Sequence, residues 1–478
     1  MTALNELGHV HFLGMAGVGV SAVARLMQAA GVTISGTDAK DLPVLEEFRS
    51  AGTAVRVGYR TENLASVEGE TGTEISTIIA SSIAAAGNPE YDEAVRRGLT
   101  VLHRSEGLAA TMAGRRAVAV AGTHGKTTTS SMTTVLLEKA GLSPTFAVGA
   151  TVSGLGVNAA AGEGEWFVAE ADESDGSLLN YAPEVAVITN VEADHLDHHG
   201  TAEAVHQVFI DFTRRITDGG QLILCADDEG ARRLLDDVRS ELADRSISVV
   251  TYGFSEDADL RIIDHTELLA SSVGQQLRVQ AFGASADVRL AAPGRHNACN
   301  AMAALAVGLR AGLELEVCAE ALEHFQGASR RFDFRGEAGG VRVYDDYAHH
   351  PTEVAAVLQA ARSTAAGKVR AIFQPHLFSR TQLFAEEFAQ ALSTADDVVV
   401  LDIYPAREEP IPGVSAELIS NPLFSGEAAP EGALLSREEA VDHVCSAAES
   451  GDIILTLGAG DVTALGPEIT AALQERSR

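Results

Sequence analysis

The segment AVAVAGTHGKTTT, residues 117–129, contains the side chains whose spacing most directly indicates chemistry. Small and β-branched residues run into a glycine turn, and an apolar-periodic stretch follows it. A buried strand, a glycine turn and a helix start in this order build a phosphate cradle, because backbone N–H groups point inward and the helix N-terminus adds its positive dipole. Lys126 would reach the outer phosphates, and the hydroxyl of Thr127 would coordinate Mg²⁺. The segment predicts a nucleoside-triphosphate site.

This phosphate loop is a shortened variant. The full pattern places a glycine five positions before Gly125, and the chain has Val120 there. An ordinary strand–turn–helix with a chance GKT is the alternative interpretation, and the flanking pattern disfavours it.

Acidic side chains follow two further predicted strands. The strand predicted at 166–171 delivers Glu170 and the acids at 172, 173 and 175, and the strand at 185–189 runs into the segment NVEADHLD. Metal ligands for Mg²⁺ belong at the carboxyl ends of parallel strands beside a phosphate loop. The first cluster therefore predicts a metal-binding or catalytic site, and a solvated acidic turn is the alternative. His195 stays open between a metal ligand, a hydrogen-bonding orienter and a capping group.

The elements that must position these groups alternate strands and helices from the start of the chain. A strand at 9–13 precedes GMAGVG and a helix at 21–30, and further strands are predicted at 32–36, 78–82 and 101–102. The G-x-x-G-x-G spacing matches a dinucleotide fingerprint only weakly, but it suits a diphosphate resting on a helix N-terminus. Tight strand–helix packing is the alternative. This block predicts a small doubly wound domain.

The later blocks repeat this order. Runs between 221 and 291 alternate with period 2 and predict an antiparallel extension, and an Ala-rich helix to residue 309 carries Asn297 and Asn300 on one face. Further strands are predicted at 332–336, 341–345, 369–373, 398–401 and 453–457, with polar residues gathered after them. We expect an α/β protein of three domains: an N-terminal Rossmann-like domain (1–107), a central P-loop ATPase-like domain with a mostly parallel sheet (108–325) and a C-terminal Rossmann-like domain (326–478).

Composition excludes several classes of function. The 478 residues carry a formal net charge of −32, which repels phosphate backbones and argues against a nucleic-acid partner. Four dispersed cysteines form no C-x-x-C pair, so we expect a reducing compartment without disulfides or structural zinc. The sequence has no run of about 18 apolar residues and no signal segment, so we expect a cytoplasmic protein without membrane insertion.

Several ordered motifs together resemble the Mur ligases, the ATP-dependent amide-forming enzymes of peptidoglycan synthesis. The resemblance covers nearly the whole chain, and the motifs that carry it are HFLGMAGVGVSAVA, GTHGKTTT, EADESD, NVEADHLD, HNACN, DDYAHHPTE, FQPHLFSRT and GAGD. It implies a ligase, important for cell shape and division, that joins L-alanine to the carboxylate of UDP-N-acetylmuramate. ATP would be the co-substrate and Mg²⁺ the cofactor, and an acyl phosphate would be the intermediate.

The resemblance also implies a role for individual residues. UDP-sugar binding would involve Gly14, Gly17, Gly19, Ser81 and Ser82. ATP binding would involve Gly122, Thr123, His124, Gly125, Lys126, Thr127, Thr128, Asn297, Asn300, Arg331 and Asp346. Thr127, Glu170 and His195 would hold Mg²⁺, and the C-terminal domain would close on ATP and on an amino-acid pocket of Tyr347, His349 and Arg380. The catalytic set would be Lys126, Glu170, His195, His349 and Arg380.

The chain departs from the family pattern at two places. Several relatives bind a second metal ion through a carbamylated lysine, but residues 140–367 contain no lysine, which leaves His195 and water for that task. The FQPH segment often continues with arginine, whereas this chain has Leu377, so the amino-acid pocket would depend more on Arg380.

Three alternative functions stay open. A recycling ligase would attach a ready-made peptide to UDP-N-acetylmuramate. A nucleotide-dependent regulatory protein would carry vestigial catalytic residues, and a dehydrogenase would use the first glycine cluster for NAD. The sequence leaves both monomer and dimer open.

Overall fold

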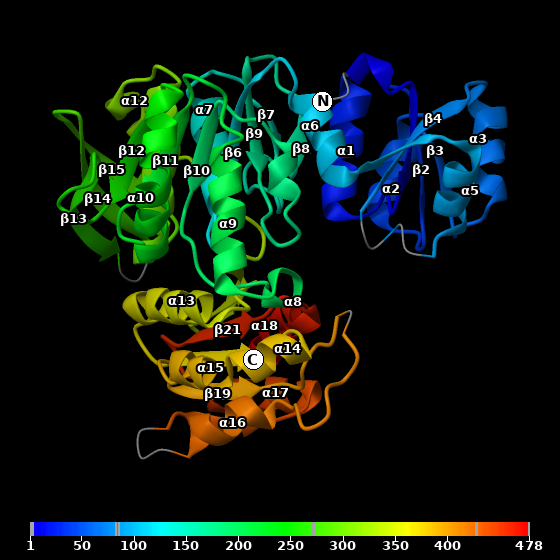
Figure 1. The fold of residues 1–478 in the computed structure, drawn as a ribbon. Helices are drawn as coiled ribbons and strands as arrows, with labels where there is room; N and C mark the ends of the chain where they lie inside the picture. The colour runs from blue at the N-terminus through cyan, green and yellow to red at the C-terminus, as the bar shows by residue number, and fades with distance from the viewer. Residues whose placement is uncertain are drawn as a thin grey trace. The chain divides into compact units, whose positions relative to one another are not determined.

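The computed structural model describes residues 4–81, 84, 87–268, 273–406, 408–425 and 429–476, without the side chain of Asp197. It confirms the predicted α/β class with three domains (Figure 1). The chain packs into two compact units. Unit 1 comprises Met1–Thr151, Leu155–Asp259 and Ala303–Leu313, and unit 2 comprises Val152–Gly154, Leu260–Met302 and Glu314–Arg478. The domain boundaries at 107/108 and 325/326 stay predictions.

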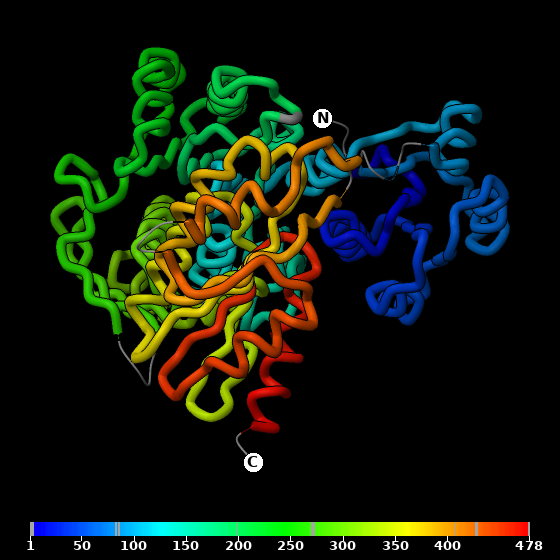
Figure 2. Tube along the Cα trace, turned by 90° about the horizontal axis from the view of Figure 1, so that it is seen from below, coloured from blue at the N-terminus to red at the C-terminus, as the bar shows by residue number. Residues whose placement is uncertain are grey.

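The N-terminal domain, the blue part of the trace in Figure 2, is a parallel sheet in the order β3-β2-β1-β4-β5. Its strands are β1 (His9–Leu13), β2 (Ile34–Asp38), β3 (Ala54–Val57), β4 (Ile75–Ala80) and β5 (Thr100–His103). Its helices are α1 (Val18–Ala29), α2 (Pro43–Ser50), α3 (Glu62–Thr71), α5 (Pro89–Arg97) and α6 (Arg104–Met112). The strand order reverses between β1 and β4, and ligands of doubly wound sheets bind beyond the strand ends at such a switch point.

The rest of unit 1 is built on strands in the order β12-β11-β10-β6-β9-β7-β8, with every neighbouring pair parallel except β7–β8. These strands are β6 (Arg116–Ala121), β7 (Thr145–Ala147), β8 (Ala159–Ala160), β9 (Trp166–Glu170), β10 (Val185–Ile188), β11 (Gln221–Cys225) and β12 (Ser248–Gly253). The helices are α7 (Lys126–Lys139), α8 (Leu196–His199), α9 (Ala202–Thr213) and α10 (Glu229–Asp244). Strand β6 is buried from Ala117 to Ala121, so the phosphate loop starts from the sheet interior.

After Val152–Gly154, unit 2 continues with three antiparallel strands, β13 (Leu260–Leu268), β14 (Gly274–Ala281) and β15 (Ala284–Leu290), of which β14 and β15 correspond to the predicted extension. Helices α11 (Arg295–Arg310) and α12 (Leu315–Leu322) follow, and the second half of α11 belongs to unit 1. Strand β13 was not predicted from the sequence.

The C-terminal domain of unit 2 has the strand order β16-β17-β21-β18-β19-β20, antiparallel only at β16–β17. Its strands are β16 (Asp333–Ala338), β17 (Val341–Asp346), β18 (Val369–Phe373), β19 (Asp397–Val400), β20 (Glu431–Leu434) and β21 (Ile453–Leu457). Its helices are α13 (Pro351–Thr364), α14 (Phe378–Leu383), α15 (Ala385–Leu392), α16 (Glu417–Phe424), α17 (Arg437–Ala447) and α18 (Leu465–Arg476).

Helices cover both faces of this C-terminal sheet. Along β18, Ala371 and Phe373 lie in one apolar core and Ile372 lies in the other, as expected when successive side chains point to opposite faces. Both faces of a parallel sheet must be covered, which is why its strands read as continuous apolar runs. In the described part of the chain, no helix combines the length and apolarity needed to cross a bilayer.

Candidate active site

The phosphate loop joins β6 to α7, as the glycine pattern predicted. Gly122 has φ of 129° and Gly125 has φ of 81°, conformations that L side chains rarely adopt. A Cβ atom on Gly122 would lie 2.0 Å from Thr189 Oγ1. The N–H of His124 donates to Asn190 Oδ1 at 2.8 Å, which ties the loop to the segment after β10. The loop is therefore fixed both by its own backbone and by its neighbour.

Lys126 forms the buried charge centre of the loop. Its Nζ donates to both carboxylate oxygens of Glu173 at 2.8 Å and to the carbonyl oxygen of Gly122 at 2.8 Å. The Glu173 side chain is 1% exposed, and burial raises its pKa to about 7 against the lowering effect of the lysine. Burial also disfavours the Lys126 ammonium, but Glu173 and Asp172 raise its pKa above the ordinary value. Sequence reasoning placed Glu173 in the acidic cluster and gave it no role of its own.

Thr127 and Glu170 meet beside this ion pair. Thr127 Oγ1 donates to Glu170 Oε1 at 3.1 Å, and the N–H of Gly149 donates to Glu170 Oε2 at 2.7 Å. A Cβ atom on Gly149 would lie 2.6 Å from Glu170 Oε2, so only glycine leaves room for the carboxylate here. Hydroxyl and carboxylate oxygens are the donors that Mg²⁺ prefers, so this pair fits the predicted cofactor.

His195 belongs to the same cluster. Its Nε2 lies 3.6 Å from Glu173 Oε1 and 3.6 Å from Asp194 Oδ2. The residue has φ of 54°, and its N–H donates to Asp194 Oδ1 at 2.7 Å. The structure thus brings His195 to Glu173, and through Glu173 to Lys126. The left-handed backbone that allows this leaves no signal in the sequence.

The N-terminal glycine turn has a different set of partners. The N–H of Gly17 donates to the carbonyl oxygen of Gly14 at 3.0 Å, and the N–H of Ala16 donates to Asp38 Oδ2 at 2.9 Å. A Cβ atom on Gly19 would lie 2.9 Å from the guanidinium of Arg104, so this cation lies against the first turn of α1.

Sequence reasoning missed Arg104, because nothing links it to the turn along the chain. Ser81 directly follows β4, and Ser82 lies outside the described residues.

In unit 2, the two predicted asparagines lie together on α11. Asn300 Nδ2 donates to Asn297 Oδ1 at 3.2 Å, and Asn297 Nδ2 donates to the carbonyl oxygen of Pro293 at 2.7 Å. Both side chains are buried. That these two residues recognise a base edge stays a prediction.

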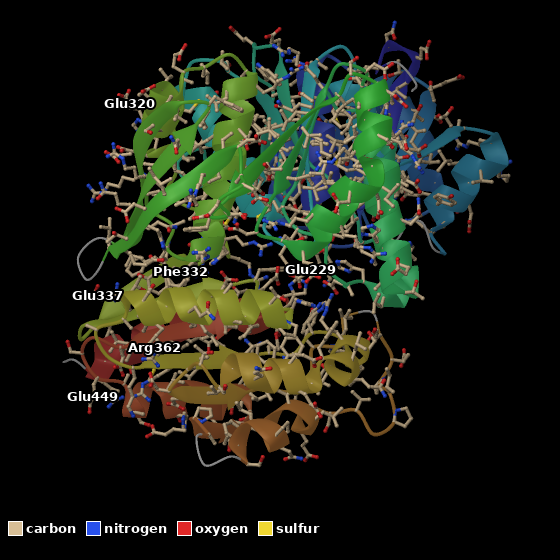
Figure 3. All side chains as sticks on the ribbon, turned by 60° about the vertical axis from the view of Figure 1, so that its left-hand side comes forward. Glu229, Glu320, Phe332, Glu337, Arg362 and Glu449 are labelled. Atoms are coloured by element: carbon tan, nitrogen blue, oxygen red, sulfur yellow. The ribbon has the colours of Figure 1, made fainter. Side chains whose placement is uncertain are left out.

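A cavity of about 390 Å³ in the same unit lies between Pro293 and the start of the C-terminal domain. Its polar lining includes Arg331 and Asp333, and its apolar lining includes Phe332, which Figure 3 labels. Nearby, Asp346 accepts from the N–H groups of Phe332 at 2.7 Å and of Ala348 at 2.8 Å. Burial raises the pKa of Asp346 to about 6, and Arg331 opposes this shift.

Two of the three residues predicted for the amino-acid pocket, His349 and Arg380, lie beside His376, which sequence reasoning gave no role, and the third, Tyr347, lies beside His349. The rings of Tyr347 and His349 lie 5.2 Å apart, and those of His349 and His376 lie 6.1 Å apart. Arg380 Nη1 lies 3.5 Å from His376 Nδ1, and the arginine is 6% exposed. Leu377, with φ of 71°, lies between these two residues in the chain.

Comparison with known proteins places nearly the whole chain in one family. Residues 9–116 match the Mur ligase family catalytic domain, 120–308 the Mur ligase middle domain and 330–460 the glutamate ligase domain of Mur ligases. The UDP-N-acetylmuramate–L-alanine ligase of Paenarthrobacter aurescens is 55% identical, over 99% of both chains. That of Renibacterium salmoninarum is 50% identical, over 98% of this chain and 97% of the relative.

Solved structures agree with these matches. The UDP-N-acetylmuramate-alanine ligase of Thermotoga maritima superposes with a TM-score of 0.77 at 25% identity, covering 98% of this chain and 99% of that one. A murein peptide ligase of Psychrobacter arcticus shares the fold, with a TM-score of 0.68 at 24% identity over 98% and 99% of the two chains. From the three family matches and the full-length relatives, this chain belongs to the Mur ligase family.

Proposed function

We propose that this chain joins L-alanine to the carboxylate of UDP-N-acetylmuramate, with ATP as the energy source. The full-length relatives named for this reaction support the assignment at 55% and 50% identity. The observation that carries it is the loop geometry, in which Lys126 faces a buried carboxylate and Thr127 bonds to Glu170. The predicted recycling reaction with a peptide acceptor is the second candidate, and those relatives favour alanine over it.

The ATP site of this proposal joins two sets of residues. Gly122 to Thr128 would receive the phosphates, because their N–H groups and the start of α7 favour anions. Asn297 and Asn300 would bind the adenine, Arg331 the phosphates and Asp346 the ribose. Thr127, Glu170 and His195 would hold Mg²⁺, which would neutralise charge on the transferring phosphoryl group. The Thr127–Glu170 contact supports this placement.

The N-terminal turn would receive the UDP-sugar. The diphosphate would rest on the glycine turn at Gly14 and Gly17 and on Gly19 in the first turn of α1, where Arg104 adds a positive charge. Ser81 and Ser82 would also contact this ligand. In a chain with a net charge of −32, such local cations are what draws in an anionic substrate.

The chemistry follows from what an amide requires. A carboxylate is a poor acyl donor, so its oxygen first attacks the γ-phosphorus of ATP, which gives an acyl phosphate and ADP. The neutral amine of alanine then attacks the acyl carbon, phosphate leaves, and a proton is lost from nitrogen. Lys126 stabilises the transferring phosphoryl group by position and charge. Arg380 would bind the alanine carboxylate in the pocket with Tyr347 and His349.

His195 and His349 are the two candidates for the base that accepts the amine proton. His195 lies beside Glu173 and Asp194, and His349 Nδ1 lies 3.2 Å from Glu353 Oε2. In both, a neighbouring carboxylate would stabilise the imidazolium that forms. Comparing His195→Gln with His349→Gln at saturating substrates distinguishes the two candidates. Loss of the base lowers kcat without raising the KM values of the substrates.

An ADP-release assay tests the function. The purified chain is given UDP-N-acetylmuramate, Mg²⁺ and ATP, with either L-alanine or an alanine-initiated tripeptide as the acceptor. The proposal expects turnover with free alanine and little with the tripeptide. Preference for the tripeptide would move the chain to the recycling reaction, and no ADP release with either acceptor would refute both.

A further inference from the structure

A continuous set of hydrogen bonds in unit 1 connects helix α1 of the N-terminal domain to the Glu170 carboxylate. The residues that carry it, Val148, Gly149 and Asn158, belong to unit 1 and lie between strands β7 and β8. At one end, Asn158 Nδ2 donates to the carbonyl oxygen of Val18 at 3.2 Å, and Asn158 Oδ1 accepts from Arg25 Nη1 at 3.0 Å. Both partners are on α1, and Val18 is its first residue.

The connection continues through the backbone. The carbonyl oxygen of Asn158 accepts from the N–H of Val148 at 2.9 Å. The next residue, Gly149, donates its N–H to Glu170 Oε2 at 2.7 Å, and the other oxygen of Glu170 accepts from Thr127. A displacement of α1 therefore reaches the Glu170 carboxylate through three hydrogen bonds, which are joined by Asn158 and by the backbone of Val148–Gly149.

The Asn158 side chain is placed to transmit such a displacement. The side chain is 7% exposed. Its amide group forms one hydrogen bond through Nδ2 and one through Oδ1, so the side chain cannot rotate without losing a hydrogen bond. Arg25 also donates to Glu47 on α2, which holds the guanidinium from its other side. By contrast, the neighbouring Val157 is 38% exposed.

We propose that Asn158 is a positioning residue that couples occupancy of the N-terminal nucleotide turn to the geometry of Glu170 in the phosphate site. The turn Gly14–Gly19 leads directly into α1, so a diphosphate bound there changes the position of Val18. Through Asn158 and Gly149 this change reaches Glu170. Nucleotide binding at the two sites is then cooperative, and by linkage each ligand raises the affinity of the other equally.

The inference rests on the proposed function, because it takes the turn as the UDP site and the loop as the ATP site. A probe that tests the coupling must not touch Glu170 itself. UDP meets this condition, since it carries the diphosphate but lacks the muramyl carboxylate that would reach the reaction centre. Any effect of UDP on the phosphate loop then passes through the protein.

Isothermal titration calorimetry measures the coupling. The Kd of UDP is determined at one fixed Mg²⁺ concentration, with and without a saturating non-hydrolysable ATP analogue. In the unsubstituted chain we expect the analogue to tighten UDP binding by about 5-fold or more. In Asn158→Ala the ratio of the two Kd values should fall towards 1, although each ligand alone still binds.

Two further variants complete the design. Asn158→Asp keeps the acceptor for Arg25 and loses the donor to Val18, so it keeps an α1 contact and should still lose the coupling. Val157→Ala is the matched control and should keep the full ratio. A purely structural role of Asn158 would lower the melting temperature in both Asn158 variants while the ratio stays unchanged.

The outcomes separate this inference from the proposed function. If the unsubstituted chain binds UDP and the analogue without cooperativity, or if both Asn158 variants keep its ratio, the coupling role is refuted and the function stands. If the unsubstituted chain binds neither UDP nor the analogue, the proposed sites are wrong and the coupling falls with them.

Discussion

Unit 1 contains the same local structure twice, a buried strand that leads through a glycine turn into a helix. At β1–α1 the turn is completed by backbone groups and by the Asp38 carboxylate, and its cation, Arg104, comes from α6. At β6–α7 the loop contains its own cation and hydroxyl, and it meets two carboxylates, Glu170 at the end of β9 and Glu173 shortly after it. Both turns suit an anion, but only the second combines a cation with oxygen ligands for a metal. Under the proposed function, the first turn would bind its ligand and the second would take part in the chemical step.

The largest effect should come from removing the cation of the second turn. Lys126→Ala should lower kcat for acyl-phosphate formation by about 10³-fold, because a charge aimed at the transferring phosphoryl group is lost. UDP affinity, measured by calorimetry, should stay unchanged. Lys139→Ala, at the other end of α7, is the control. ADP release at a normal rate by Lys126→Ala would remove the functional difference between the two turns.

The next effect separates the turns by their glycines. Gly122→Ala should destabilise the fold by about 3 kcal/mol, because its Cβ atom would lie 2.0 Å from Thr189 Oγ1 and its φ is 129°. Gly17 has φ of −61°, and Gly17→Ala should cost less than about 1 kcal/mol. Thermal unfolding measures both. Equal melting temperatures would mean that the phosphate loop adapts to a side chain.

A smaller effect should follow from the first turn's cation. Arg104→Ala should raise the Kd of UDP by about 10-fold, the usual loss for one charge-assisted contact, and should leave ATP-analogue binding unchanged. Arg96→Ala, which removes an exposed cation on α5, is the matched control. An unchanged UDP affinity in Arg104→Ala would show that the backbone of the turn is sufficient.

The smallest effect is a pH dependence of stability that comes from β1, the strand that leads into the first turn. Strand β1 contains His9, whose Nε2 lies 2.8 Å from Ser35 Oγ and whose Nδ1 lies 3.2 Å from the Thr73 carbonyl oxygen. Burial and the neighbouring His11 lower its pKa, while the Thr73 carbonyl and Glu68 act in the opposite direction. Because the folded pKa is depressed, the stabilisation is complete above the unfolded pKa of about 6.5 and is lost as the pH falls through the lower folded value.

Thermal unfolding between about pH 7 and pH 5 measures this loss, which should stay below about 1.4 kcal/mol per pH unit. His9→Gln should flatten the profile. A profile that is equally steep in His9→Gln would assign the acid sensitivity to another group.

The sequence predicted what depends on local patterns. The strand–turn–helix of residues 117–129, the buried strands β9 and β10 and the antiparallel extension are confirmed, because glycine spacing and apolar runs are read within a few residues. It missed five strands of the described chain: β3, which is short and half-exposed, the first antiparallel strand, β13, and the short strands β7, β8 and β20.

Contacts between distant segments left no signal in the sequence. Glu173 was one of several acids until the fold brought it to Lys126, and Arg104 is 85 positions from Gly19. His195 could not be assigned, because its position depends on a backbone angle of 54° that histidine rarely adopts. His376 was visible as part of a motif, but its place among Tyr347, His349 and Arg380 follows only from the packing of unit 2.

Helix α7 has a consequence for the loop it carries. Every residue from Thr127 to Leu137 is buried, although seven of these eleven side chains bear a hydroxyl group. The hydroxyls of Ser130, Thr133 and Thr134 donate to carbonyl oxygens of the preceding turn, so the helix satisfies much of its own polarity. Between Thr127 and Leu137, the helix therefore has no solvent-exposed face. Because α7 is packed on all sides, a force on its N-terminal end is distributed over the surrounding sheet. Under the proposed function, the loop would therefore keep its position while the bound phosphates change their bonds.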